Sequence, residues 1–464
     1  MQLLQFYYLF GGAMEKLFKL KEHNTNVRTE ITAGITTFLS MVYILAVNPS
    51  ILSASGMNAA SVFTATAVSA AFATLLMAFL ANYPIALASG MGLNAYFAYT
   101  VCGELSAAGI QDPWKVALAA ILVEGIVFVL LSLCKFREAL VNKIPANLKL
   151  GITAGIGLFI TFVGLQGAGI TINDDSTLVN LGSIGTPQVA LAFIGLMILV
   201  ILYHFNVTGY ILWSILITWG LGMLAQAIGW YQVDIDAGIY SLFPDFSSGI
   251  KPAAPTMFAF DFGYVAGHIV DFAVIVFAFL FVDLFDTAGT LVGVANKAEL
   301  LDENGDLPKA SNALLSDAVG TIAGACLGTS TVTSYVESSA GAAAGGRTGL
   351  TSVTTAVLFL LSLLISPVFL AIPGFATTPA LVFVGLLMLS SVKNMDFSED
   401  AAGAISGFMA IIMMPFTYSI ANGIMFGMLS YVIVRIFTGK IKDIHPVMWI
   451  SAGLFAIRII TLVV

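Results

Sequence analysis

Two stretches with the same unusual order of residues decide the fold: YPIALASGMGLNAYFAYT (83–100) and GTSTVTSYVESSAGAAAGG (328–346). In the first, Pro84 and two glycines precede Asn94; in the second, β-branched and hydroxyl residues precede Glu337 and small residues follow it. Small residues alone would only allow close helix packing, which explains neither Asn94 nor Glu337. Each stretch is therefore predicted to be an extended strand that leads into a half-helix beginning near Asn94 or Glu337.

The composition of the whole chain requires lipid as its solvent. Its 464 residues are 59% hydrophobic and 9% charged, whereas a soluble domain carries about 25% charged residues. Non-helical backbone at membrane depth is tolerated only where protein or a cavity covers it. Two half-helices that meet there would point their backbone N–H groups at one electron-rich ligand near the bilayer midplane.

Apolar runs long enough to span a bilayer, about 20 residues, fall into two sets of seven. The first set is expected near 30–51, 61–82, 84–102, 115–134, 148–169, 188–204 and 208–230. After an acidic, Pro-rich stretch (231–264), the second set is expected near 265–290, 310–327, 329–345, 347–371, 377–392, 401–416 and 419–438. The last apolar run, 445–463, is either an extra span or a helix along the surface. Residues 1–13 are too short to span and do not read as a signal peptide.

The basic residues test this topology. With the N-terminus inside, 15 of the 18 Lys and Arg residues fall on one side: Lys16, Lys19, Lys21, Arg28, Lys135, Arg137, Lys143, Lys149, Lys297, Lys309, Arg347, Lys393, Arg435, Lys440 and Lys442. This bias is what the positive-inside rule demands. A cytoplasmic N-terminus is therefore predicted.

The two sets of seven spans also predict an inverted repeat. Because seven is odd, the second set must enter the membrane upside down relative to the first. The tetrapeptide FVGL occurs at 162–165 and again at 383–386, in the fifth span of each set. A short helix–break–helix pair follows in each half, at 188–230 and 401–438. Inverted repeats of this kind are typical of secondary transporters, whose substrate sites lie at the repeat interface.

Acidic residues inside the spans are the second functional signal. FVDLFDTAGTLVG (281–293) places Asp283 and Asp286 three residues apart, on neighbouring positions of one helix face. A charge at the bilayer centre costs about 2.5–3.5 kcal/mol on insertion scales, so such residues mark functional sites. Burial favours the neutral acid, which suits a group that takes up and releases protons. Asp286 equally fits a local cap, and Glu124 and Asp317 fit structural acids bonded to hydroxyls.

Tyr335 stands two residues before Glu337, so in an extended segment both side chains point to the same face. A ring beside a carboxylate suits a flat aromatic ligand, although a single Tyr also fits simple packing. The three cysteines have no CxxC spacing, which argues against a zinc site. No nucleotide-binding domain and no nucleophile–base pair are found, so neither ATP drive nor enzymatic catalysis is expected.

Four segments in the right order resemble the signatures of AzgA-type purine permeases, which transport adenine, guanine and hypoxanthine. They are EITAGITTFLSMVYILAVNP (30–49), ALASGMGLNAYFAYT (86–100), FVDLFDTAGTLVG (281–293) and STVTSYVESSAGAAAGGRTGLTS (330–352). The resemblance covers the chain from Met14 onward. It implies a core domain and a gate domain, and proton-coupled uptake of a nucleobase.

The resemblance also assigns roles to matching positions. The eighth-span acid of the family falls on Asp283, with a second Asp at Asp286; the third-span Asn falls on Asn94, after Gly92; and the tenth-span acid falls on Glu337. Two positions depart from relatives: Ser338 stands where some have Pro, and Thr287 stands where the uracil branch has His. The second departure moves the expected proton carrier onto the carboxylates.

The expected fold is an all-α polytopic membrane protein with 14 transmembrane segments in 7+7 inverted repeats, and with two short strands in the broken third and tenth segments. The expected parts are a cytoplasmic N-terminus (1–29), a core domain (30–134 and 265–371), a gate domain (148–230 and 377–438) and a C-terminal apolar segment (439–464).

The resemblance predicts import of purine nucleobases by proton symport with alternating access in a bacterial inner membrane, without a cofactor and compatibly with a homodimer. Asp283 and Glu337 are expected to hold the base through its ring N–H groups. The remaining expected contacts are Asn94, Gly92, Tyr335 and Ser338. The candidates for the proton are Asp283, Asp286 and Glu337.

Two alternatives stay open. An anion carrier on the same fold would use the attraction of helix N-termini for anions, but two carboxylates in the site argue against it. A channel or membrane-embedded enzyme is the other, against which stand the broken helices and the missing catalytic set.

Overall fold

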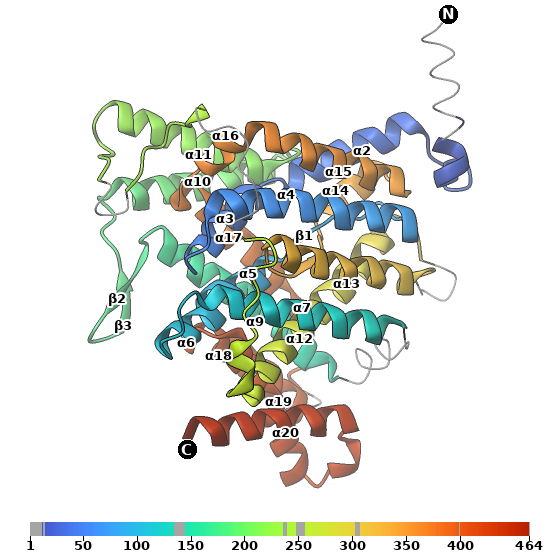
Figure 1. Cartoon of the computed structure of the whole chain (residues 1–464), viewed down its shortest axis with the longest axis vertical. Coiled ribbons are helices and arrows are strands. Elements are labelled where there is room, and N and C mark those ends of the chain that lie inside the picture. The colour runs from blue at the N-terminus through green and yellow to red at the C-terminus, as the bar shows by residue number, and fades with distance from the viewer. Residues whose placement is uncertain are drawn as a thin grey trace, which may run out of the picture.

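The computed structural model describes residues 12, 14–133, 144–234, 239–246, 256–301, 307–398 and 400–463. Figure 1 shows long helices lying side by side, with the broken segments among them. Nine helical segments of the described residues are long and apolar enough to cross a membrane. Residues 1–11 and 13, together with Cys134, Lys135, Arg137 and Lys143, lie outside the described residues.

Every predicted apolar run contains a helix at nearly the predicted position. The first half comprises α2 (Val27–Met41), α3 (Ile44–Ser53), α4 (Ala59–Leu76) with η1 (Met77–Ala81), β1 (Leu87–Ser89), α5 (Met91–Ala95) with η2 (Tyr96–Val101) and α6 (Cys102–Ala107), α7 (Pro113–Leu133), α9 (Ala146–Gly167), α10 (Pro187–His204) and α11 (Tyr210–Ala227). Breaks within a run have local causes: the first run is interrupted just before Ile44, and Pro49 lies inside α3.

The second half repeats this order. It comprises η4 (Gly263–Ala266), α12 (Ile269–Lys297), α13 (Ala310–Leu327), β4 (Val332–Ser334), α14 (Ser338–Ala343), α15 (Gly349–Leu361) with η5 (Ser362–Ile365) and α16 (Ser366–Leu370), α17 (Gly374–Leu389) with η6 (Ser390–Asn394), α18 (Ala401–Phe416) and α19 (Ile420–Phe437). After η7 (Ile441–Asp443), α20 (Pro446–Val463) packs against α19 and α12.

The predicted strands in the third and tenth segments are confirmed. β1 and β4 pair antiparallel with Leu87 opposite Ser334, and both strands are buried. The first half-helix begins before Asn94, and the second begins just after Glu337. Since Gly90 is still extended, α5 begins at Met91 and Asn94 lies inside it, whereas Glu337 is the residue just before α14.

A second, exposed hairpin was not predicted. β2 (Thr171–Asp174) pairs with β3 (Leu178–Leu181), and the hairpin projects from the left side of the molecule in Figure 1. Hydrogen bonds from Asn180, Thr177 and Ser176 to the carboxylate of Asp174 order the turn and hold the pKa of Asp174 well below its usual range. The run of Asn, Asp, Ser and Thr at 173–177 carries this turn chemistry.

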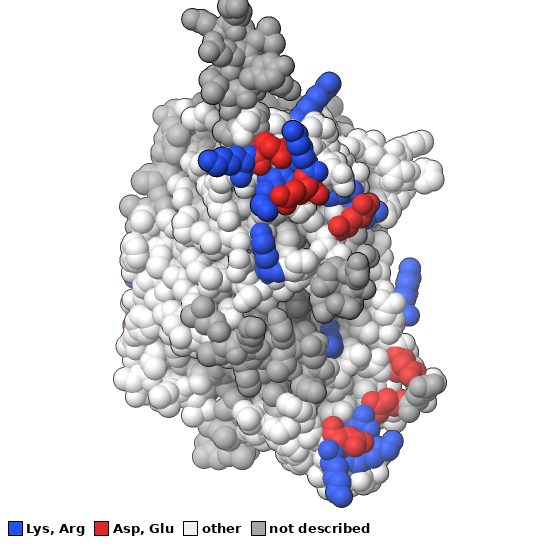
Figure 2. Space-filling model, turned by 90° about the vertical axis from the view of Figure 1, so that its right-hand side faces the viewer, with Lys and Arg blue, Asp and Glu red and all other residues white. Residues whose placement is uncertain are grey.

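Segments that the charge analysis put on one side lie together at one end of the bundle. The Asn82 amide donates to the carbonyl of Phe18, and the Tyr83 hydroxyl to that of Pro308. Arg347 pairs with Glu299 at 3.4 Å. Figure 2 looks onto this face and shows Lys and Arg side chains gathered there among acidic ones. At the opposite end, the amide of Asp261 donates to the carbonyl of Lys115.

The helices pack as two groups. In one, α2 contacts α14 and α15, α4 contacts α13 and α15, and α7 contacts α12 and α13, around the strand pair. In the other, α9 contacts α17 and α18, α10 contacts α11 and α17, and α18 contacts α19. Glycines allow close approach in the second group: a Cβ on Gly157 would lie 2.6 Å from the carbonyl oxygen of Gly385. Gly385 belongs to the repeated FVGL.

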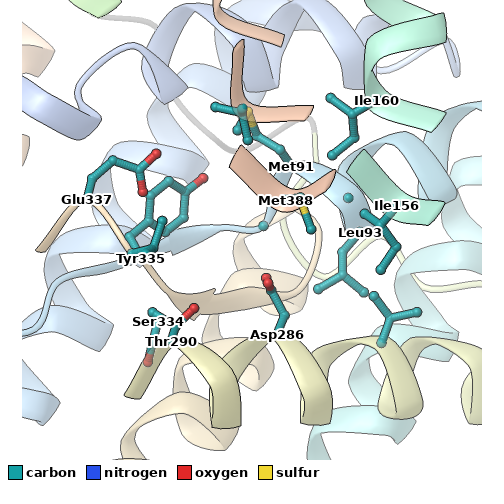
Figure 3. A pocket seen from close by; sticks show the side chains of 15 residues that line it. Met91, Leu93, Ile156, Ile160, Asp286, Thr290, Ser334, Tyr335, Glu337 and Met388 are labelled. Carbon is teal, nitrogen blue, oxygen red and sulfur yellow. The ribbon is translucent and has the colours of Figure 1, made fainter. Parts of the chain in front are cut away.

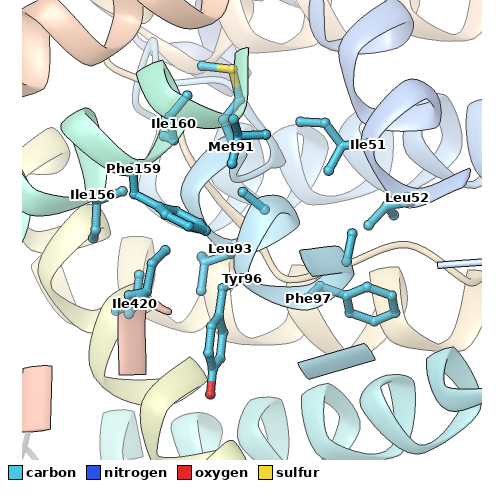
Figure 4. Close-up of a cluster of buried hydrophobic side chains, with 14 of the residues drawn as sticks. Ile51, Leu52, Met91, Leu93, Tyr96, Phe97, Ile156, Phe159, Ile160 and Ile420 are labelled. Carbon is cyan, nitrogen blue, oxygen red and sulfur yellow. The ribbon is translucent and has the colours of Figure 1, made fainter. Parts of the chain in front are cut away.

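A buried apolar cluster joins the two groups (Figure 4). Leu93, Tyr96 and Phe97 come from the first group, and Ile156 and Phe159 come from α9. These residues are almost completely buried.

Candidate functional site

A cavity of about 70 Å³ lies where the two broken segments meet (Figure 3). Its lining comes from five parts of the chain: Gly90–Leu93, Ile156 and Ile160, Val282 with Asp286 and Thr290, Ser334–Glu337, and Val384 with Met388. Both helix groups contribute, the first through its strands and α12 and the second through α9 and α17. The cavity therefore sits at the interface of the groups, next to the half-helices.

The cavity continues into a vestibule of about 780 Å³, which shares Asp286 and Glu337 with it. The vestibule reaches Gly293, on the Lys297 side of Asp286, and the η6 residues around Lys393. Both lysines belong to the side that the charge analysis predicts to be cytoplasmic. The vestibule thus leads from the site toward the basic face.

Glu337 lies at the start of α14 and lines both spaces. Its Oε1 accepts a hydrogen bond of 2.5 Å from the hydroxyl of Tyr43, a completely buried residue at the break between α2 and α3. This short bond fixes the orientation of the carboxylate. One oxygen of Glu337 is thereby held in place beside the cavity.

Tyr335 also lines the cavity, although the segment from Tyr335 to Glu337 is a turn and not the extended segment that we expected. Figure 3 shows its ring beside Glu337. The Tyr335 hydroxyl donates to the carbonyl oxygen of Ser89, and its amide donates to that of Ala86. Both polar groups of Tyr335 are thus engaged by the first broken segment, which leaves the ring to form a flat wall.

Asp286 and Asp283 point in different directions, although three residues separate them. Asp286 lines the cavity together with Thr290, which follows one turn later. Asp283 is completely buried and does not line it; its Oδ1 lies 3.2 Å from the hydroxyl of Thr287. Three residues turn a helix by about 300°, a 60° offset, and this offset separates the cavity from the interior of the first helix group.

Of the other predicted residues, one lines the cavity and two do not. Gly92 lines the cavity, and a Cβ there would lie 2.6 Å from Cγ2 of Ile156. Asn94 is completely buried away from it and accepts a hydrogen bond from Ser330. The Ser338 hydroxyl accepts from the amide of Ala86 at 3.0 Å, so Ser338 joins the broken segments.

Sequence reasoning missed Tyr43 and Thr290. Tyr43 stands in an apolar run with nothing in its pattern to mark it, because its role depends on a break in the helix and on contact with a residue 294 positions away. Thr290 had a usable signal: it follows Asp286 by four residues and so shares its helix face. The apolar side of the cavity, Ile156, Ile160, Val384 and Met388, lies in runs that look like any other span.

Metal chemistry has no support in the described residues, since they hold no group of three His, Cys, Asp or Glu side chains placed to bind a metal. Neither cavity has a Lys or Arg among its described lining residues. The arrangement offers carboxylate acceptors, a flat ring and an apolar floor. The backbone N–H groups at the start of α5 can add donors, because the first turn of a helix leaves them free.

Sequence comparisons connect this chain to known proteins. The family model described as Permease family matches residues 28–426. The guanine/hypoxanthine permease PbuO of Bacillus subtilis is 45% identical over 96% of this chain and 100% of its own length. The adenine permease AdeP of Escherichia coli is 40% identical over 97% of this chain and 96% of its own length.

Solved structures agree on the architecture. The transmembrane domain of the cyanobacterial bicarbonate transporter BicA superposes with a TM-score of 0.62 and 16% identity, over 85% of this chain and 96% of that domain. The murine anion transporter Slc26a9 in its inward-facing state superposes with a TM-score of 0.61 and 12% identity, over 88% of this chain and 68% of that one. At this identity the likeness is one of fold.

Proposed function

The chain belongs to the Permease family, and from that premise we propose that it imports purine nucleobases (guanine, hypoxanthine and adenine) by proton symport. Its relatives are permeases and not enzymes. The observation that carries the choice of substrate is the pairing of Glu337 and Asp286 around one cavity beside the ring of Tyr335. A purine presents ring N–H groups at its edge and a flat aromatic face.

The proposed contacts follow from the lining. Glu337 and Asp286 accept hydrogen bonds from N–H groups of the base, while Tyr335 and the apolar side chains cover its faces. Gly92 leaves room for the base edge near the N–H groups of α5. Asp286 takes the ligand role that the sequence favoured for Asp283, since Asp286 lines the cavity.

Three of the expected site residues do not line the cavity, and we propose that they act without touching the base. They are Asp283, Asn94 and Ser338. Ser338 and Asn94 hold the two broken segments together through Ala86 and Ser330. Asp283 remains a candidate for proton coupling, because it lies on the same helix as Asp286 and is enclosed.

Transport is proposed to follow alternating access. The first helix group is the core domain and the second is the gate domain, with 14 segments in two inverted repeats. Support comes from the position of the site at the interface of the groups and from the vestibule that leads toward the basic face. The protein is placed in a bacterial inner membrane with a cytoplasmic N-terminus and is compatible with a homodimer; the basic face supports that orientation.

An anion carrier is the second candidate, because solved structures of the same fold include a bicarbonate transporter. Two acidic side chains and no basic one among the described lining residues disfavour an anion in this cavity. The fold alone carries no argument for substrate.

Uptake into proteoliposomes tests the proposal. Labelled guanine, hypoxanthine and adenine should accumulate when the outside is more acidic than the inside, and Asp286→Asn and Glu337→Gln should abolish accumulation. Glu104→Gln, at an exposed acid in α6, is the matched control. Undiminished uptake in both cavity variants, or competition by sulfate or bicarbonate, would contradict the purine assignment.

A further inference from the structure

Three acids lie behind the wall of the cavity, and the proposed base contacts do not use them. Glu124 on α7, Asp283 on α12 and Asp317 on α13 are completely buried. We call them the enclosed acids, and we call Asp286 and Glu337 the cavity acids. Ionised carboxylates in an apolar interior are costly unless donors or opposite charges surround them.

The enclosed acids share hydroxyl donors. Thr287 has a single hydroxyl proton, yet its Oγ1 lies 3.2 Å from Asp283, 2.9 Å from Asp317 and 2.7 Å from Thr333. The other hydroxyl contacts are long: 3.4 Å from Thr331 to Glu124 and 3.5 Å from Ser334 to Asp317. Each hydroxyl donates once, so the single proton of Thr287 is shared among several acceptors.

Glu124 and Asp283 approach each other within the range of a side-chain hydrogen bond. The Oε1 atom of Glu124 is buried and accepts no hydrogen bond from any described residue. Two carboxyl groups bind each other only when one of them carries a proton, as in carboxylate pairs that share one. A proton between them satisfies the orphaned oxygen.

Basic groups that could replace this proton lie elsewhere. On the elements packed against the enclosed acids, the charged residues with described side chains are Glu104, Lys115, Lys149, Asp271, Asp286, Lys297, Lys309, Glu337 and Arg435. Lys115 pairs with Asp112 at the outer end of α7, Arg435 pairs with Asp400, and Lys297 and Lys309 lie at helix ends. Lys149 lies in the first turn of α9. The other acids on these elements, Glu104, Asp271 and the cavity acids, only add negative charge.

We propose that Glu124 and Asp283 form a binding site for the transported proton, separate from the cavity where the base binds. The inference deepens the proposed function and rests on it. A proton from the outer solution adds to one carboxylate oxygen of the pair and forms an O–H···O bond. On release toward the inside, that O–H bond breaks and the pair regains its negative charge.

The tenth segment links the two sites. Thr331, Thr333 and Ser334 face the enclosed acids, and Ser334 also lines the cavity, directly before Tyr335. Asp283 lies one turn from Asp286 on α12. When the enclosed pair binds a proton, one negative charge near Asp286 is removed and β4 is held more firmly against its neighbours. Base binding and proton binding therefore favour each other.

The decisive variant is Glu124→Gln, which keeps the volume of the side chain and removes its titration. We expect purine exchange between loaded proteoliposomes to stay within about threefold of wild type, while accumulation driven by a pH gradient falls by about tenfold or more. The pH dependence of purine affinity in the purified protein should flatten. Asp283→Asn is the second variant should Glu124→Gln fold poorly, and Glu104→Gln is the control.

Infrared spectroscopy detects a protonated carboxyl group directly and does not depend on purine transport. Wild type at neutral pH should show a protonated carboxyl band that Glu124→Gln weakens and Glu104→Gln preserves. An unchanged band, accumulation equal to wild type in Glu124→Gln, or a requirement for sodium ions in place of a pH gradient would overturn the proton site. Wild type that shows the band but moves no purine would instead refute the proposed function and leave the proton site standing.

Discussion

The broken tenth segment separates two environments that contain the same chemical group. The cavity acids face a space open to the basic side of the protein, and Tyr43 supplies Glu337 with a donor at 2.5 Å. The enclosed acids have no exposure and share a few hydroxyls. The carboxylates in front of the segment can reach a ligand in the cavity, whereas those behind it meet only the protein interior. In our proposal, position relative to one strand, and not residue type, divides ligand binding from proton binding.

The largest effect is expected from the cavity acid Glu337. Glu337→Gln removes a charged acceptor and should lower kcat/KM for purine uptake about 100-fold, equivalent to about 2.7 kcal/mol. The thermal midpoint of the purified protein should change little, since Glu337 already faces a cavity. Initial uptake rates and a melting curve check both.

A comparison with the enclosed side sharpens this result. Glu124→Gln should keep purine affinity but lose the pH response, the reverse of Glu337→Gln. If both variants lose purine affinity equally, the proposed division of roles between the cavity acids and the enclosed acids is wrong.

A smaller effect is expected from Tyr43→Phe. This change removes the donor to Oε1 of Glu337, and hydrogen bonds to charged groups contribute about 1.5–3 kcal/mol, so KM should rise about tenfold with a smaller change in kcat. Tyr83→Phe is the matched control, because Tyr83 donates to the carbonyl of Pro308 at the basic face. Equal KM values for the two variants would show that Tyr43 does not position the cavity acid.

Gly92→Ala should weaken transport less than Tyr43→Phe. The added Cβ would lie 2.6 Å from Cγ2 of Ile156 on α9, so the helix groups must separate slightly at the cavity. We expect kcat/KM to fall about fivefold, within the 1–3 kcal/mol typical of overpacking. Gly103→Ala is the control, since a Cβ there meets nothing within 4 Å. An equal fall in both would point to a general effect of alanine.

Much of this arrangement could be predicted from local patterns. The apolar runs placed the helices, and the interrupted stretches before Asn94 and Glu337 placed the strand pair, because each pattern records a local backbone preference. The choice between Asp283 and Asp286 could not be made in this way. Both lie within 60° on one helix, and only the neighbours of α12 decide which one meets the cavity. Tyr43 was hidden for the same reason: its partner is distant in sequence.

The smallest effect on uptake is expected behind the segment, from Thr331→Val. The Thr331 hydroxyl lies 3.4 Å from Glu124 and does not line the cavity, so KM at a fixed acidic pH should stay within about twofold of wild type. Removing a donor from a carboxylate makes its charged form less favourable, so the enclosed pair should keep its proton to higher pH. The midpoint of the pH–uptake profile should therefore move upward. Thr354→Val, which removes a hydroxyl bonded only to its own helix backbone, should leave the midpoint in place. A change in KM without a change in the midpoint would mean that Thr331 affects base binding and not proton binding. The proposed separation of the two sites by the strand would then be wrong.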